Sequence, residues 1–112
     1  IIPDVVRAAV APWAGVRELH PIACLRNART AYSLCDAAGG IIAEFTDDRV
    51  DALDIVRGVA TSWREWEIEL GPAAPTDPAA ISEFFAGVAH AVYAVGGQPP
   101  SSGSKLQRAL GR

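Results

Sequence analysis

Three glutamates recur at every second position in the second half of the chain, at Glu65, Glu67 and Glu69. Alternate residues of a β-strand point to the same side, so this spacing places three carboxylates on one strand face. Like charges about 7 Å apart repel one another, and a solvated face tolerates them. Carboxylate oxygens are also preferred ligands of Mg²⁺ and Mn²⁺, which bridge to phosphate. The stripe therefore indicates either a solvated face or a cation site.

Two arginines offer the complementary chemistry, because a planar guanidinium group donates paired hydrogen bonds to phosphate oxygens. Arg26 and Arg29 lie three residues apart. They share a strand face only where the strand is broken between them, and we expect a break or bulge near Asn27. The alternative is two ordinary surface arginines.

The surrounding pattern predicts an α+β fold in which antiparallel strands are flanked by N- and C-terminal helices. Residues 3–11 indicate a short helix that ends at Pro12. Alternation predicts strands over 19–36, 41–46 and 61–70, and the second could extend to Leu53. Capping residues predict helices over about 78–95 and 104–110. If the glutamates face an interior, the opposite residues point outward under these helices: Trp63, Trp66, Ile68 and Leu70.

Composition limits the partners. The chain has 112 residues with 13 acidic and 10 basic side chains, so it is at most one domain with a net charge of −3. A weakly acidic chain does not favour a nucleic-acid polymer, and no apolar run is long enough to span a membrane. Two cysteines form no disulfide framework, which favours a reduced, cytoplasmic setting.

Four segments occur in a fixed order: residues 19–30, the pairs Ala43-Glu44 and Asp47-Asp48, residues 63–70, and residues 100–106. Together they resemble the CYTH family, most closely the actinobacterial branch in which a CYTH domain is often joined to a polyphosphate-associated CHAD domain. The resemblance implies an eight-stranded antiparallel barrel, a triphosphate tunnel metalloenzyme, in which basic side chains bind triphosphate and acidic ones hold divalent metal. It covers nearly all of residues 1–112 but only the C-terminal half of such a domain, so the other half would lie outside this chain.

The resemblance also implies residue roles. By this resemblance, three basic residues would bind phosphate: Arg26, Arg29 and Lys105, the last at the end of the domain. Binding of Mg²⁺ or Mn²⁺ falls to four acidic residues, Glu65, Glu67, Glu69 and Glu44. Two departures are present: Cys24 stands where the family usually has a basic residue, and the opening Glu-x-Glu-x-Lys strand is absent.

Three functions follow as hypotheses. The complete domain could be a phosphohydrolase that cleaves a phosphoanhydride as a triphosphatase does, with this chain alone inactive. It could instead bind polyphosphate or a nucleotide without turnover. It could also be a structural half-barrel completed by an N-terminal half-domain or a second copy. No catalytic residue is identified, and Asp47 and Asp48 are expected at a turn or a solvated edge.

Overall fold

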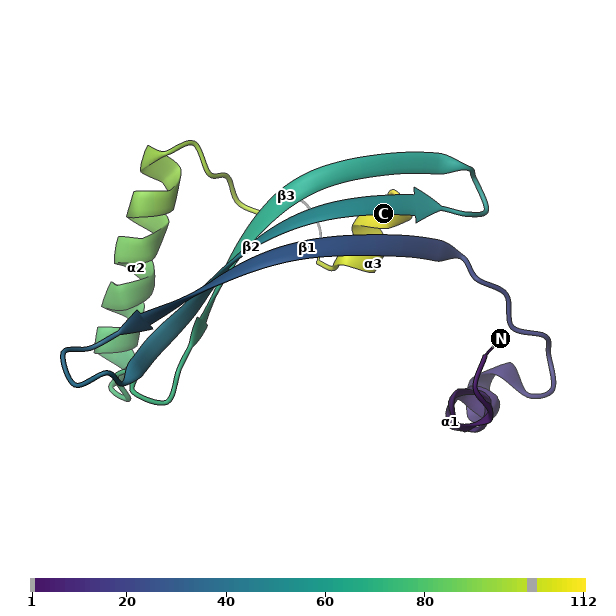
Figure 1. The fold of residues 1–112 in the computed structure, drawn as a ribbon, viewed down its shortest axis with the longest axis horizontal. Coiled ribbons are helices and arrows are strands. Elements are labelled where there is room, and N and C mark those ends of the chain that lie inside the picture. The colour runs from purple at the N-terminus through teal and green to yellow at the C-terminus, as the bar shows by residue number, and fades with distance from the viewer. Residues whose placement is uncertain (1, 101–102) are drawn as a thin grey trace.

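The fold is a three-stranded antiparallel sheet with helices before and after it (Figure 1). The computed structural model describes residues 2–100 and 103–112. In chain order these form α1 (Asp4–Ala14), β1 (Ala23–Cys35), β2 (Ile41–Asp54), β3 (Val59–Leu70), α2 (Pro78–Ala94) and α3 (Lys105–Ala109). The sheet order is β1-β2-β3, so the predicted α+β class with hairpin connections is confirmed.

Both hairpin turns are fixed by an aspartate that accepts bonds from backbone N–H groups. At the first turn, Asp36 Oδ1 accepts from the N–H groups of Ala38, at 3.0 Å, and Gly40, at 2.8 Å. At the second, Asp54 Oδ1 accepts from the Arg57 N–H at 3.0 Å. With both turns held locally, β2 runs on to Asp54, well beyond residue 46.

Strand β1 is continuous through the position where a break was expected. Asn27 pairs with Val50 in regular register, and the register shifts only between Leu34 and Cys35. The expectation of a break near Asn27 was therefore wrong. The long β2 strand offers a partner to every residue around Asn27, and no proline or glycine interrupts the ladder there. Residues three apart on β1 consequently lie on opposite faces of the sheet.

The helix ends follow local signals with one exception. Asp77 accepts a bond from the Ala80 N–H at 3.0 Å, and Ser104 accepts one from the Gln107 N–H at 3.1 Å, so both predicted caps are confirmed. Helix α1, however, continues through Pro12 to Ala14. Pro12 removes a single backbone bond from an exposed helix, and water can satisfy the carbonyl that loses it.

Helix α1 instead ends at Gly15, whose φ is 61°. Ser101 and Ser102, between the two predicted C-terminal helices, lie outside the described residues. None of the helices in the described residues is long and apolar enough to cross a membrane.

The fold is unusually open for its mass. Its accessible surface is 8348 Å², whereas a compact monomer of 11.8 kDa exposes about 5,900 Å². The radius of gyration is 18.7 Å, against about 13 Å for a compact chain of this length. The buried apolar side chains among the described residues are small ones: Ala43, Val50, Ala52 and Ala109. In addition, β1 and β3 each leave one edge unpaired within the described residues, so the sheet can accept further strands.

Candidate functional site

The candidate site is built on one row of the sheet that crosses all three strands. Arg29 of β1 is the partner of Asp48 of β2, and Asp48 is the partner of Glu65 of β3. Directly opposed residues point to the same side, so these three side chains share what we call the site face. Asp48 is 0% exposed and lies in the middle of β2, so the expectation of a turn or solvated edge was wrong for this residue.

Asp48 binds two cations at once. Arg29 donates from Nε to Oδ1 at 2.7 Å and from Nη2 to Oδ2 at 2.8 Å, which is a bidentate fork. Lys105, the first residue of α3, donates from Nζ to Oδ2 at 3.0 Å. The hydrogen bonds from Arg29, opposed by burial and reinforced by Lys105, hold the pKa of Asp48 well below its ordinary range. The same fork raises the pKa of Arg29, so both partners are charged.

Lys105 also faces two of the predicted glutamates. Its Nζ lies 3.7 Å from Glu65 Oε2 and 3.9 Å from Glu67 Oε1. Burial acts to lower the pKa of Lys105, but the hydrogen bond to Asp48 and the charges of the three carboxylates outweigh it and raise that pKa. Lys105 is therefore a fixed positive charge among three carboxylates, even though it comes from a helix far along the chain.

Trp63 belongs to the site face and not to the outward set in which it was expected. Its Nε1 donates to Glu65 Oε1 at 2.6 Å, and the Arg108 guanidinium lies 4.8 Å from the centre of its ring. Odd-numbered residues of β3 share the face of Glu65, which is the reason for the correction. Trp63 thus holds one oxygen of Glu65 and leaves the other toward Lys105.

The remaining predicted acidic residues lie further along the same face. Glu67 is 56% exposed, and Glu44 and Glu69 are direct cross-strand partners. Within residues 2–100 and 103–112, no three acidic, histidine or cysteine side chains converge closely enough to hold a metal ion. A Mg²⁺ ion, however, is commonly held by one or two carboxylates together with phosphate oxygens and water. The described carboxylates of the site face therefore form no metal centre by themselves.

Arg26 does not join this cluster. It is exposed and pairs with Asp51 on the opposite face, because β1 is unbroken between it and Arg29. Cys24 lies on the same opposite face as Arg26. The structure thus brings together Arg29, Lys105, Glu65 and Glu67, places Glu44 and Glu69 nearby, and separates Arg26 from them.

Asp48 is the central residue that sequence reasoning missed. The sequence contains part of this information. If the second strand extends to Leu53, pairing residues outward from the first hairpin turn places Asp48 close to Arg29. The irregular step between Leu34 and Cys35 shifts that count, so only the observed register fixes the pair.

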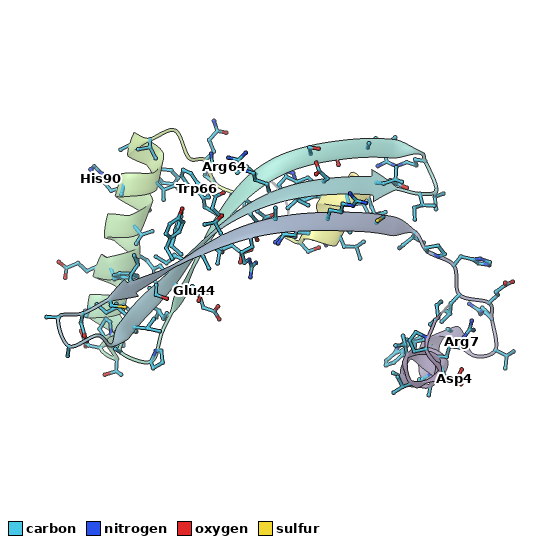
Figure 2. The ribbon with its side chains drawn as sticks, viewed as in Figure 1. Asp4, Arg7, Glu44, Arg64, Trp66 and His90 are labelled. Atoms are coloured by element: carbon cyan, nitrogen blue, oxygen red, sulfur yellow. The ribbon has the colours of Figure 1, made fainter. Side chains whose placement is uncertain are left out.

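The opposite side of the sheet carries aromatic side chains and is called here the aromatic face. A groove of about 530 Å³ separates it from α2. The groove is lined by Tyr32, Leu34, Phe45, Asp47, Arg64, Trp66, Ile68, Val88, Ala91 and Val92. Figure 2 shows Trp66 and Arg64 on the side of α2, with Glu44 away from them and His90 on the outside of the helix. This largely apolar groove contains none of the predicted phosphate or metal residues.

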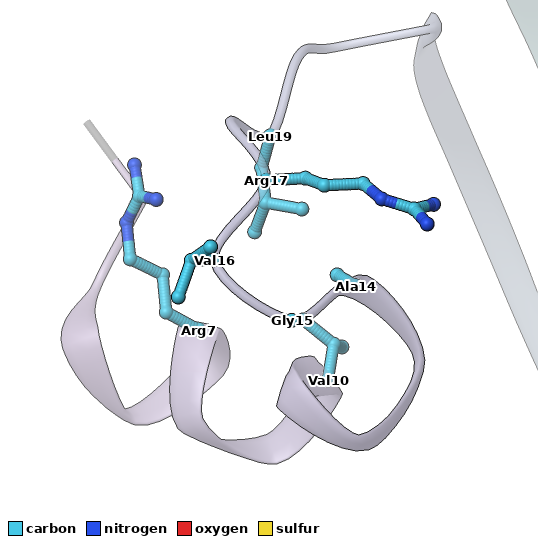
Figure 3. A pocket seen from close by; sticks show the side chains of 7 residues that line it. All are labelled: Arg7, Val10, Ala14, Gly15, Val16, Arg17 and Leu19. Carbon is cyan, nitrogen blue, oxygen red and sulfur yellow. The ribbon is translucent and has the colours of Figure 1, made fainter.

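A smaller hollow of about 200 Å³ lies within the N-terminal segment, between α1 and residues 15–19. Arg7 and Arg17 line it, but their guanidinium groups point away from one another (Figure 3). This hollow therefore offers no pair of converging cations.

Comparison with known proteins gives relatives but no family. No family profile matches the chain, and no solved structure matches it. The chain is 33% identical, over an alignment of 118 positions, to two uncharacterized proteins of Mycobacterium tuberculosis, from strains CDC 1551 and H37Rv. The alignment covers 96% of this chain and 22% of each relative. The chain thus spans about a fifth of the length of the curated relatives that it matches.

Proposed function

We propose that this chain forms one wall of a CYTH-type tunnel that binds triphosphate or polyphosphate together with Mg²⁺ or Mn²⁺. In the complete domain the proposed reaction is cleavage of a phosphoanhydride. The observation that carries the proposal is the cluster in which Arg29 and Lys105 both bind Asp48 on one face of an antiparallel sheet.

The two cations keep donors to spare for a ligand. A guanidinium group has five N–H donors and an ammonium group has three. Arg29 uses two of its donors on Asp48, and Lys105 uses one. Asp48 therefore orients both side chains while leaving donors for phosphate oxygens. This arrangement supports Asp48 as a positioning residue and Arg29 and Lys105 as phosphate-binding residues.

The charge balance supports an accompanying divalent ion. Two cations, Arg29 and Lys105, face three carboxylates, those of Asp48, Glu65 and Glu67, which leaves a net charge of −1 before any ligand arrives. A polyanion is repelled by such a cluster unless further cations come with it. Glu65, Glu67, Glu69 and Glu44 are the side chains that would hold Mg²⁺ or Mn²⁺. When bound, the ion neutralises charge on the phosphate oxygens.

The openness of the sheet supports a wall that needs completion. An antiparallel sheet with unpaired edges and a charged face is covered in a stable assembly by further strands. The surface in excess of a compact monomer is about 2,400 Å², the scale of a permanent interface. A separate half-domain and a second copy of this chain are the two candidates for the missing wall.

The test is calorimetric titration of the full-length natural protein with tripolyphosphate, with and without Mg²⁺. We expect Mg²⁺-dependent binding that Arg29→Ala weakens at least tenfold, since about 1.4 kcal/mol of charge-assisted bonding is lost. Arg26→Ala is the matched control, because it removes the same group from the opposite face of the same strand. Equal losses in both variants would contradict the assignment of the site face.

Release of inorganic phosphate, measured in the same samples, separates two versions of the proposal. Metal-dependent release supports the phosphohydrolase. Binding without release supports the module that holds polyphosphate or a nucleotide without turnover.

A further inference from the structure

The groove between the aromatic face and α2 has the size and the lining of a site for a small molecule. Its volume is about 530 Å³, and ligand sites in proteins hold about 300–1,000 Å³. Its lining is mostly apolar or aromatic, and its charged side chains are those of Asp47 and Arg64. An apolar pocket with a few polar groups at one place is typical of sites that orient a small ligand.

The apolar walls of this groove are incompletely covered. Tyr32 is 52% exposed and Leu34 is 40% exposed, although both line the groove from the sheet. Val88 and Val92 line it from α2 and are only half-buried. Exposed apolar side chains that gather in a concave surface are typical of a binding site. The walls therefore favour a ligand with an apolar body.

Along the strands, this face changes from apolar to cationic. Three successive rows pair one residue of β2 with one of β3: Phe45 with Ile68, Asp47 with Trp66, and Arg49 with Arg64. Figure 2 shows Arg64 and Trp66 together on the side of α2. Like charges that are directly opposed destabilise an antiparallel pair, so the row of two arginines favours an anion between them.

The hydrogen bonds at this end of the groove also favour an anion. Both carboxylate oxygens of Asp47 accept from Arg64, at 2.9 and 2.7 Å. These bonds, opposed by burial and reinforced by the charge of Arg49, lower the pKa of Asp47, so its carboxylate is charged and already bound. Arg64 spends two of its five N–H donors there, and Arg49 forms no ion pair within residues 2–100 and 103–112. Two guanidinium groups beside one carboxylate leave a charge of +1 and free donors.

We propose that this groove binds a small organic acid, with its carboxylate between Arg49 and Arg64 and its apolar body between the aromatic face and α2. The single excess positive charge matches one carboxylate. The site lies on the face opposite to Arg29 and Asp48, so it is separate from the proposed phosphate site.

The experiment is calorimetric titration of the full-length natural protein with octanoate and with octanamide, which has the same chain and no charge. We expect octanoate to bind at least about tenfold more tightly, because only the carboxylate accepts charge-assisted bonds as an anion. Decanoate should bind about tenfold more tightly than octanoate, because two further CH₂ groups are buried in the groove.

Two variants, each with a matched control, locate the site. Arg49→Gln removes the unpaired cation and should weaken octanoate binding at least about fivefold, whereas Arg7→Gln, on α1, should leave it unchanged. Ala91→Phe fills the groove from α2 and should weaken octanoate binding at least about tenfold. Ala86→Phe adds the same ring on the opposite side of that helix and should have no effect.

Absence of octanoate binding would overturn the proposal, as would equal affinity for octanoate and octanamide. Octanoate affinity that both Arg49→Gln and Ala91→Phe leave unchanged would also overturn it. So would a dimer that Ala91→Phe dissociates and Ala86→Phe does not, measured by analytical ultracentrifugation, because a second copy would then occupy the groove. Arg49→Gln should leave tripolyphosphate affinity unchanged, so failure of tripolyphosphate binding would be a separate result.

Discussion

Two adjacent aspartates of β2 accept the same kind of fork on opposite faces of the sheet. The two carboxylate oxygens of Asp48 each accept a hydrogen bond from Arg29, at 2.7 and 2.8 Å. Those of Asp47 each accept one from Arg64, at 2.9 and 2.7 Å. In each case the guanidinium hydrogen bonds lower the pKa of the aspartate. By local geometry alone the two pairs are equivalent.

Their neighbours make them different. Beside Asp48 stand Lys105 and Glu65, so the fork belongs to a cluster of charges with donors and acceptors left over. Beside Asp47 stands Trp66, and the Arg64 guanidinium lies 5.1 Å from the centre of that ring. The first fork is the one to which the proposed function assigns ligand binding, whereas the second packs against an aromatic cluster. A side-chain pair thus acquires its role from the face on which the strand presents it.

Removal of Trp66 tests the aromatic face and should have the largest effect on stability. Its ring packs against Phe45 on the aromatic face, with centroids 5.7 Å apart. We expect Trp66→Ala to lower the free energy of unfolding by about 3 kcal/mol. Urea denaturation measures this. Trp13→Ala is the matched control, because Trp13 is 79% exposed on α1. A comparable loss of stability in Trp13→Ala would contradict the assignment of Trp66 to the packing of the aromatic face.

Neutralising Asp48 tests the site face. Asp48→Asn keeps the size of the side chain but removes the charge that binds two cations, so we expect a loss of about 2 kcal/mol in the same assay. Asp47→Asn should destabilise less, because Asp47 is partly exposed and pairs with one arginine. If the two variants lose the same free energy of unfolding, the two aspartates contribute equally to stability despite their different neighbours.

The pH dependence of the free energy of unfolding tests the contribution of Asp48 separately. A carboxyl group whose pKa is lower in the folded than in the unfolded chain stabilises the fold fully above the unfolded value, about 3.9, and progressively less as pH falls toward the folded value. Asp48 has such a lowered pKa, as do Asp47, through Arg64, and Asp54, through bonds from Arg57.

We therefore expect the difference in stability between wild type and Asp48→Asn to be constant from pH 7 to pH 5 and to shrink between pH 4 and pH 2. Denaturation series at each pH measure it. The Asp47 and Asp54 contributions cancel in this difference, because both proteins keep those residues. A difference that stays constant down to pH 2 would contradict the lowered pKa of Asp48.

The smallest effect should come from the helix caps. Ser104→Ala removes the bond to the Gln107 N–H and should cost α3 about 1 kcal/mol of local stability. Because Lys105 follows directly, tripolyphosphate affinity should also fall by a fewfold factor. Asp77→Ala removes the corresponding cap of α2, on the other face, and should leave that affinity unchanged. Calorimetric titration of both variants provides the comparison.

Several features of this protein follow from its sequence alone, because the interactions behind them span only a few residues. Alternation at Glu65, Glu67 and Glu69 placed three carboxylates on one face, as the structure has them. Asp77 and Ser104 cap helices through bonds to residues three positions on. The same local reasoning wrongly predicted that the first helix ends at Pro12. Water around an exposed helix can bond to the carbonyl that loses its partner at a proline.

Only the tertiary structure decided which charges meet. The Arg29–Asp48 pair joins residues 19 positions apart, and the Lys105–Asp48 bond joins residues 57 positions apart. Because side chains alternate along a strand, a shift of one residue in register would move Asp48 to the other face and exchange it with Asp47. Residue types and spacing therefore determined that this chain carries carboxylates and cations on strands. The pairing of β1 with β2 and the docking of α3 determined that Asp48, and not Arg26, lies at their centre.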